Sequence, residues 1–283
     1  MIIRVRHVAA ACVLGAALTA CGAPDAPTAA RPAPSSASSA PADSSRPPTL
    51  TPGAGGLTPV FTNGPRTGDK TVALTFDADM TADEGPRAAA GERFDNPELI
   101  STLRTLKVPA TVFMTGRWAE EYPAEARSIG ADRNFEIANH SYSHYAFTGD
   151  CYGLPRVAAD GMKNDVERAY TAFRKAGIAH PMPYFRFPGG CYDRQVLKTL
   201  APTGVTAVQW DVVSGDAFAT DSDAVARQVM EGVKPGSVVV MHCTRSAAPA
   251  TERAVRAIVP ELRAKGYRFV KVSQLIGAAA ARH

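Results

Sequence analysis

Short apolar runs alternate with helical stripes along most of this chain, and that alternation restricts its fold more than any other feature. Runs of apolar and β-branched residues that are bounded by turn residues predict strands. The helical segments between them suit crossovers that join parallel strands. We therefore expect an α/β fold, either a barrel or a doubly wound sheet, built on the strands Thr71–Phe76, Ala110–Thr115, Phe135–Ala138, Tyr184–Phe187, Gly204–Trp210, Ser237–His242 and Tyr267–Val272.

Three of the intervening segments have the spacing of amphipathic helices. Asn96 is a suitable cap and Pro97 suits a first helical turn, and apolar residues follow at helical spacing from Leu99 to Leu106. The same spacing runs from Met162 to Phe173 and from Ala254 to Leu262. Each stripe predicts a helix that covers one face of the sheet.

The N-terminal residues are not expected to belong to this fold. Arg4 and Arg6 precede an apolar stretch that is short for a membrane span, and small residues come before Cys21, so residues 1–21 are typical of an export signal. Residues 22–66 are dominated by Ala, Pro, Ser, Thr and Gly, which predicts a disordered linker. Residues 67–283 are long enough for one domain with a substantial core.

Cys21 also suggests how the protein is held after export. The segment Leu18-Thr19-Ala20-Cys21 resembles the lipobox of bacterial lipoproteins, in which the cysteine is lipidated and becomes the first residue of the mature protein. The alternative is an ordinary secretory signal that is cleaved nearby. We therefore expect an exported protein, either anchored by lipid at Cys21 on the extracellular face of the cell membrane or secreted.

Net charge and cysteine content constrain the prediction less than the strand and helix pattern does. The formal net charge of +4 at pH 7 is small and its basic residues are scattered among acids, so we expect no nucleic-acid partner. Three cysteines lie in the predicted domain, and outside the cytoplasm two of them can pair. Cys151 and Cys191 both lie in glycine-rich surroundings near the candidate site, which favours a bridge between them and leaves Cys243 free.

Polar residues suited to metal-dependent hydrolysis gather at the predicted strand ends. His140 and His144 are four positions apart, so both imidazoles can face one metal ion if this stretch turns helically. Alone, the pair is also compatible with surface histidines or histidines satisfied in a core. Asp77, Arg186 and His242 also follow predicted strands, and the carboxyl ends of parallel strands form the site in barrels and open α/β enzymes.

Taken together, these segments resemble the polysaccharide deacetylases, the NodB-homology enzymes of carbohydrate esterase family 4. The resemblance covers about residues 71–272 and implies an irregular (β/α) barrel of about seven parallel strands. His140 and His144 match the family's metal-binding histidines. Asp77 matches the catalytic base of the first motif, in which a second aspartate that binds metal follows directly. Here Ala78 comes between, so Asp79 ligates if the loop bulges; otherwise water or Asp77 completes the metal site, and Asp79 caps a turn.

The remaining motifs match in part. The resemblance implies that Arg186 orients Asp77, although a purely structural ion pair is the alternative, and that the backbone of Gly189 and Gly190 lines the groove and stabilises the oxyanion. It also implies that Asp216 orients His242 and keeps it protonated as the general acid, and that Val240 borders the substrate. The fourth motif retains Asp216 but has lost its tryptophan. Two aromatic residues are candidates to replace that ring, with core or rim packing as the alternative, namely Trp210 and Phe218.

The expected reaction is metal-dependent hydrolysis of an acetamide by a monomeric enzyme. Zinc is the expected divalent ion on ligand type, and cobalt, nickel or manganese fit the same ligands. A protein anchored in the envelope meets peptidoglycan, so the first hypothesis is removal of N-acetyl groups from the N-acetylglucosamine-containing polysaccharide of peptidoglycan. Other N-acetylglucosamine polymers remain open as substrates. Two alternatives remain: an esterase that acts on acetylated xylan, and a catalytically inactive carbohydrate-binding domain.

Overall fold

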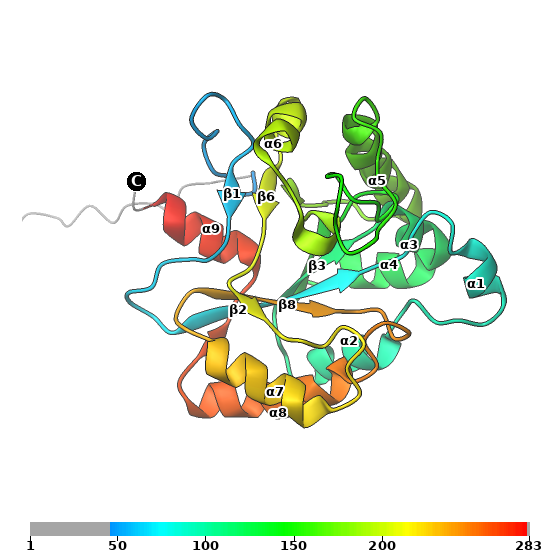
Figure 1. The fold of residues 1–283 in the computed structure, drawn as a ribbon. Coiled ribbons are helices and arrows are strands. Elements are labelled where there is room, and N and C mark those ends of the chain that lie inside the picture. The colour runs from blue at the N-terminus through cyan, green and yellow to red at the C-terminus, as the bar shows by residue number, and fades with distance from the viewer. Residues whose placement is uncertain (1–45, 282–283) are drawn as a thin grey trace, which may run out of the picture. The chain divides into compact units, whose positions relative to one another are not determined.

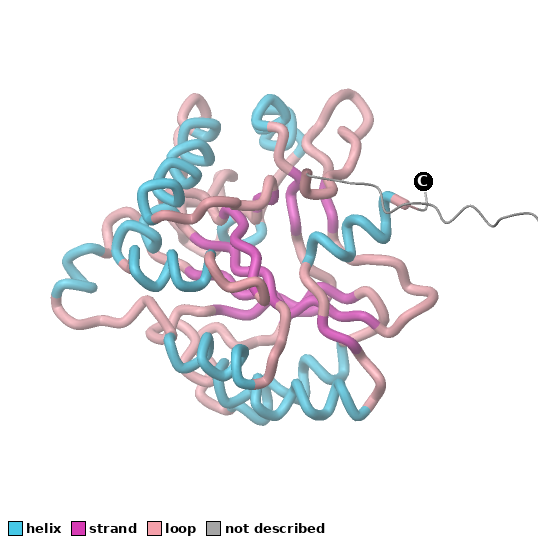
Figure 2. The backbone as a smooth tube through the Cα atoms, turned by 180° about the vertical axis from the view of Figure 1, so that it is seen from behind, coloured by secondary structure: helices cyan, strands magenta, loops and turns pink. Residues whose placement is uncertain are grey.

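A single parallel sheet forms the centre of the protein. The computed structural model describes residues 46–281, and within that range the sheet has nine strands in the order β1-β6-β5-β4-β3-β2-β8-β7, with β9 added to β2. The two ends of this order do not pair with each other, so the sheet curls without closing (Figures 1 and 2). The strands are β1 Val60–Phe61, β2 Thr71–Ala78, β3 Ala110–Met114, β4 Phe135–Asn139, β5 Tyr184–Phe185, β6 Thr206–Val208, β7 Val212–Val213, β8 Ser237–His242 and β9 Arg268–Phe269.

Helices surround the sheet, as Figure 2 shows from behind. They follow the strands in alternation, which confirms the predicted α/β barrel, here an incomplete one. Each predicted run contains a strand, although the last is strand only over Arg268–Phe269 because Val272 already begins a helix. The helices are α1 Gly85–Ala89, α2 Pro97–Thr105, α3 Gly116–Glu121, α4 Pro123–Gly130, α5 Met162–Ala176, α6 Arg194–Leu200, α7 Ser222–Gly232, α8 Thr251–Ala264 and α9 Val272–Ala280, with 3₁₀ turns at η1 Pro188–Gly190 and η2 Ala201–Thr203.

The predicted helical stripes are the buried faces of α2, α5 and α8. Leu99 and Leu103 of α2 and Ile258 of α8 are fully buried, and the two helices pack side by side beneath β2 and β8 (Figure 1). Asn96 caps α2 by accepting a hydrogen bond from the Leu99 amide. None of the helices within residues 46–281 combines the length and hydropathy that a membrane span needs.

The folded part begins earlier than the predicted boundary at residue 67. Val60 and Phe61 pair with β6, and the hydroxyl of Tyr184 donates to the Pro48 carbonyl at 2.7 Å. The prediction of a linker up to residue 66 was therefore wrong for residues 46–66. The physical reason is that β6 offers a free edge, which a single valine–phenylalanine pair can cover even within a proline- and glycine-rich stretch. The predicted signal, Cys21 and the linker before residue 46 lie outside the described residues.

A half-buried carboxyl group makes the stability of the fold depend on pH. Burial, followed by the neighbouring carboxylate of Asp95, raises the pKa of Glu125 in α4 to about 7. Because the unfolded chain ionises at lower pH, stability from this group is present below about pH 4.5 and is lost as pH rises to about 7. In the wild-type protein this rise in pH should lower the free energy of unfolding by about 2 kcal/mol. In Glu125→Gln this part of the decrease should be absent.

Urea unfolding at pH 5 and pH 8 tests this expectation. The wild-type protein should lose stability between the two pH values, and the glutamine variant should lose less of it. An equal loss in both proteins would show that Glu125 is not the titrating group.

Candidate active site and metal centre

The parallel register brings the candidate catalytic side chains to one edge of the sheet. Asp77 of β2 lies directly across from Phe113 of β3 on one side and His242 of β8 on the other. The turn that follows β4 and the turn that follows β5 reach the same edge, because neighbouring parallel strands end together. Residues that are far apart in the sequence therefore share one site.

Asp79 lies between the two histidines. Its Oδ1 atom is 3.3 Å from Nε2 of His140 and 3.6 Å from Nε2 of His144. No bulge is needed, because β2 pairs regularly with β3 through Ala78. Side chains two positions apart on a strand point to the same side, so Ala78 separates Asp77 from Asp79 and still leaves both facing the site.

The histidine pair is held by a tight turn, so the predicted helical turn was wrong. Ser141 and His144 have positive φ angles of 69° and 56°, which an α-helix excludes. Local side chains hold this backbone: Oδ1 of Asn139 accepts from the Ser141 amide at 2.8 Å, and Oγ of Ser141 accepts from the His144 amide at 2.9 Å. Such bonds compete with helical ones. The imidazole centroids nevertheless lie 5.0 Å apart.

These three residues fit a divalent cation. Oδ1 of Asp79 is buried and has no hydrogen-bond partner within residues 46–281, and the three ligand atoms lie within 4.8 Å of one another. Nδ1 of His140 bonds to the carbonyl of Arg186 at 2.9 Å, which directs Nε2 towards Asp79. An orphaned carboxylate oxygen between two imidazole nitrogens is the ligand set that zinc prefers.

The protonation states of two of the three residues, His144 and Asp79, also favour metal binding. Burial lowers the pKa of His144 to about 4, so this imidazole is neutral near pH 7 and its nitrogen lone pair is free. For Asp79, burial opposes ionisation, but the adjacent imidazoles of His144 and His140 outweigh it and hold the pKa well below its ordinary range. A neutral imidazole and an ionised carboxylate are the forms that bind metal.

Asp77 forms a buried ion pair with Arg186, as predicted. Nη1 of Arg186 donates to Oδ1 of Asp77 at 2.6 Å, and the arginine side chain is fully buried. Nε of Arg186 donates to the Val208 carbonyl, and its guanidinium lies 3.9 Å from the centre of the Phe113 ring. The free oxygen of Asp77, Oδ2, is 3.7 Å from Nε2 of His140 and therefore faces the metal ligands.

His242 and Asp216 form a second coupled pair. Nδ1 of His242 is 2.8 Å from Oδ1 of Asp216, and the carboxylate is anchored by the His242 amide and the Thr251 hydroxyl, each at 2.7 Å. Burial opposes the charged imidazole, but the attraction of Asp216 outweighs it and raises the pKa of His242 to about 10. Nε2 points into the site, 3.9 Å from Oδ2 of Asp79. His242 is thus a cationic acid that is 23 % exposed.

Gly189 and Gly190 form the turn that follows the Arg186 segment. Both have positive φ angles, 64° and 75°. The side-chain amide of Gln209 donates to the Gly190 carbonyl at 2.7 Å and fixes the turn. Val240 lies on the same side of β8 as His242 but is only 5 % exposed, so it offers little surface to a ligand.

The predicted disulfide bridge between Cys151 and Cys191 is confirmed, and Cys243 is free and buried. The bridge ties the loop after the histidine turn to the diglycine turn. Sequence reasoning missed several residues that hold the site in shape, because most of their partners are distant in the chain. Asp165 of α5 accepts from the Tyr142 amide at 2.8 Å, and Ser214 and Thr251 donate to Asp216.

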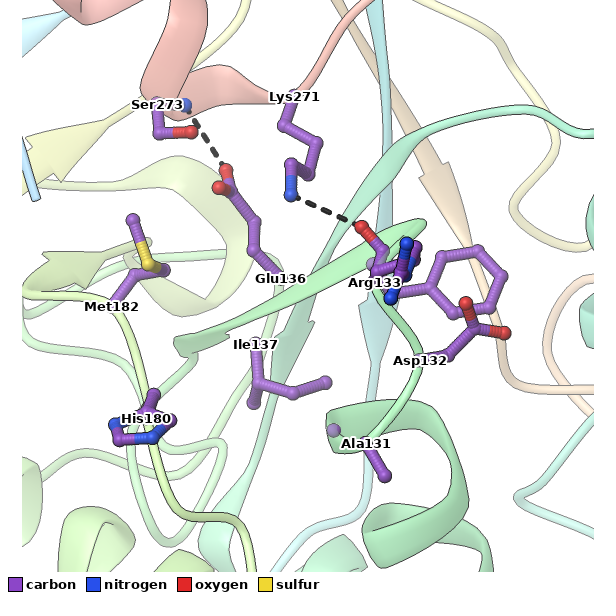
Figure 3. A pocket seen from close by; sticks show the side chains of 11 residues that line it. Ala131, Asp132, Arg133, Glu136, Ile137, His180, Met182, Lys271 and Ser273 are labelled. Atoms are coloured by element: carbon purple, nitrogen blue, oxygen red, sulfur yellow. Dashed lines mark hydrogen bonds between the residues drawn. The ribbon is translucent and has the colours of Figure 1, made fainter.

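Two hollows differ in their relation to this site. One, of about 300 Å³, borders the histidine turn and is lined by Ser143, Tyr145, Arg156, Asp165 and Arg168, among others. The other, of about 430 Å³, contains Glu136 and His180 (Figure 3). It lies at the opposite, amino end of β4, so it shares no residue with the site.

Comparisons with known proteins agree with this geometry. A family model described as "Polysaccharide deacetylase" matches residues 64–208. A chitooligosaccharide deacetylase of Sinorhizobium fredii is 33 % identical over 62 % of this chain and 73 % of its own length. A peptidoglycan-N-acetylglucosamine deacetylase of Bacillus cereus is 29 % identical, over 74 % and 89 % respectively. A solved peptidoglycan N-acetylglucosamine deacetylase superimposes with a TM-score of 0.65 at 25 % identity, covering 77 % of this chain and 92 % of that one.

Proposed function

The chain belongs to the polysaccharide deacetylase family, and we propose that it is a metal-dependent enzyme that removes N-acetyl groups from N-acetylglucosamine residues of peptidoglycan. One observation carries the proposal. A largely buried cluster of Asp79, His140 and His144 lies between a carboxylate, Asp77, and a cationic acid, His242. Hydrolysis of an amide needs a base for water and an acid for the leaving nitrogen, and a mere binding domain needs neither.

Each side chain has a defined part in the reaction. A divalent ion held by Asp79, His140 and His144, with zinc favoured by the ligand types, supplies Lewis-acid polarisation when bound. Asp77 takes a proton from the attacking water, while Arg186 holds that carboxylate in place through the bond from Nη1 to Oδ1. The Gly189 amide donates to the oxyanion. His242 gives its proton to the departing nitrogen as the C–N bond breaks, which leaves acetate and a free amine.

The surroundings of the site favour an acidic polysaccharide. Within residues 46–281, neither Arg156 nor Arg168 forms an ion pair, and both line the hollow beside the histidine turn. Peptidoglycan carries carboxylates on its stem peptides, which guanidinium groups recognise well. Neutral chitooligosaccharides and O-acetylated xylan offer no such groups. This observation supports our proposal that peptidoglycan is the substrate.

We also propose where the enzyme acts. The apolar N-terminal segment and the lipobox-like sequence around Cys21 support export and a lipid anchor at the outer face of the cell membrane. Residues between this anchor and the catalytic domain then span the distance to the polysaccharide. Fractionation of the producing cells tests this location.

Release of acetate tests the function directly. The zinc-loaded protein is incubated with purified peptidoglycan, chitopentaose and acetylated xylan, and acetate and free amines are both measured. Equal amounts of acetate and amine from peptidoglycan or chitopentaose support N-deacetylation. Acetate without amine, from xylan alone, would support the esterase instead. No acetate from any of the three, with metal bound and the fold intact, would support the inactive carbohydrate-binding domain.

Asp216→Asn should lower turnover about 10²-fold and change its pH dependence. The asparagine keeps the shape of the side chain but loses the charge that raises the pKa of His242. The pKa of His242 then falls, so the imidazole loses its proton at lower pH and the alkaline limb of the pH–rate profile moves to lower pH. Turnover measured from pH 6 to pH 10 checks this.

A matched control is Asp223→Asn, an exposed aspartate in the first turn of α7. It should leave both turnover and the pH profile unchanged. If Asp216→Asn lowered turnover without moving the alkaline limb, Asp216 would not act by charging His242.

A further inference from the structure

The space above the diglycine turn is filled by the loop that precedes it in the sequence. A Cβ atom built on Gly189 would lie 2.6 Å from Sγ of Cys151, 3.2 Å from Cδ2 of Tyr152 and 3.4 Å from Cδ1 of Leu154. The position therefore requires glycine for two reasons, its left-handed φ of 64° and this close approach. The loop from Cys151 to Leu154 occupies the volume where a side chain of residue 189 would otherwise lie.

A second aromatic residue bounds the next position. A Cβ atom on Gly190 would lie 2.5 Å from the Trp210 ring. Tyr152 therefore packs against Gly189, and Trp210 packs against Gly190. The Trp210 ring also lies 5.4 Å from the guanidinium of Arg186, which pairs with Asp77. The two aromatic residues thus border the turn that closely follows Arg186, the partner of Asp77, in the sequence.

Tyr152 is held in an unusual state for a large aromatic residue. Its side chain is 87 % exposed, its backbone has a positive φ of 53°, and it makes no hydrogen bond or ring contact within residues 46–281. Positive φ is costly for a residue with a bulky side chain. The adjacent disulfide bridge between Cys151 and Cys191 anchors this loop to the far side of the diglycine turn. The positive φ belongs to a tight turn, in which the Leu154 amide donates to the Cys151 carbonyl at 3.0 Å and Gly153 also has a positive φ of 72°. Packing within the domain does not explain why the large aromatic ring is exposed, whereas a ligand would.

We propose that Tyr152 is a stacking platform for a sugar ring of the polysaccharide next to the residue that is deacetylated, and that the Cys151–Cys191 bridge positions it. Pyranose rings present flat arrays of C–H groups, which pack on aromatic faces. Because the platform lies beside the reacting centre, it contributes to binding of a chain longer than one sugar and adds nothing to the chemical step. The inference rests on the proposed function for the identity of the substrate.

Kinetics on substrates of two lengths test the platform. Tyr152→Ala should raise KM for chitopentaose by about threefold to tenfold with kcat nearly unchanged, and should leave the slow turnover of single N-acetylglucosamine units unaffected. Tyr152→Phe keeps the ring and should match the wild type. If the phenylalanine variant behaved like the alanine variant, or if KM did not change in Tyr152→Ala, the stacking role would be refuted.

Removal of the bridge tests the positioning. The double variant Cys151→Ser with Cys191→Ser should show the KM increase of Tyr152→Ala, with unchanged metal content and unchanged turnover of the single sugar. An unchanged KM would show that the bridge does not position Tyr152. Calorimetric titration of chitopentaose into the wild type and into Tyr152→Ala keeps the inference testable if no acetate is released, since that result would refute the proposed function alone.

Discussion

Replacing Asp77 with asparagine should lower the rate of acetate release by about 10² to 10⁴-fold, because the attacking water loses its general base. Metal content should not change, since Asp79, His140 and His144 remain in place. The rate with peptidoglycan or chitopentaose, measured beside metal analysis of the same sample, checks both parts. Near-normal turnover in this variant would exclude Asp77 as the base.

The choice of asparagine follows from the buried ion pair. Arg186 is fully buried, so an alanine at position 77 would leave its charge without a partner and destabilise the fold by about 3–5 kcal/mol. The amide oxygen of asparagine still accepts the bond from Nη1. Asp69→Asn is the matched control, because Asp69 also pairs with an arginine, Arg268, but at the surface, where both side chains are more than half exposed. It should change neither turnover nor stability measurably.

Removal of the metal ion should have the second large effect. Chelation should reduce acetate release by about 10³-fold, since Lewis-acid polarisation contributes several kcal/mol to transition-state stabilisation. Added zinc should restore the wild-type rate. It should not restore the rate of His144→Ala, which has lost one of three ligands and should bind zinc more weakly in a direct titration.

His180→Ala is the control for the histidine variant. His180 is exposed and lies in the hollow at the amino end of β4, far along that strand from His144. This variant should bind zinc and release acetate like the wild type. Full activity of the chelated wild type, with no metal detected, would overturn the metal-dependent mechanism.

The fold was predictable from the sequence because its signals are local. Apolar runs such as Ala110–Met114, and stripes such as the one through Leu99 and Leu103, depend only on residues close together in the chain. Two strands escaped prediction. Val60–Phe61 and Val212–Val213 have only two residues each, and their pairing with β6 and β8 arises from edges that form elsewhere in the chain.

The residues of the site were predictable from the sequence, but their arrangement in space was less so. Spacing suggested that a helical turn would bring His140 and His144 together, whereas bonds from Asn139 and Ser141 hold a turn with positive φ. Ala78 seemed to displace Asp79, whereas β2 pairs regularly to its end at Ala78 and Asp79, the next residue, still faces the same site as Asp77. Backbone conformation decided both outcomes.

By itself, the sequence determined the order of the longer strands and helices and the residues that gather at the strand ends, since these follow from periodicity and residue type. It favoured the pairing of Cys151 with Cys191 without determining it. Only the tertiary structure decided the distances that make chemistry possible: Asp77 on a buried arginine, Asp79 between two imidazoles, and the Cys151–Leu154 loop over Gly189. Register between strands and long-range packing set those distances, and neither is encoded in any short stretch of the chain.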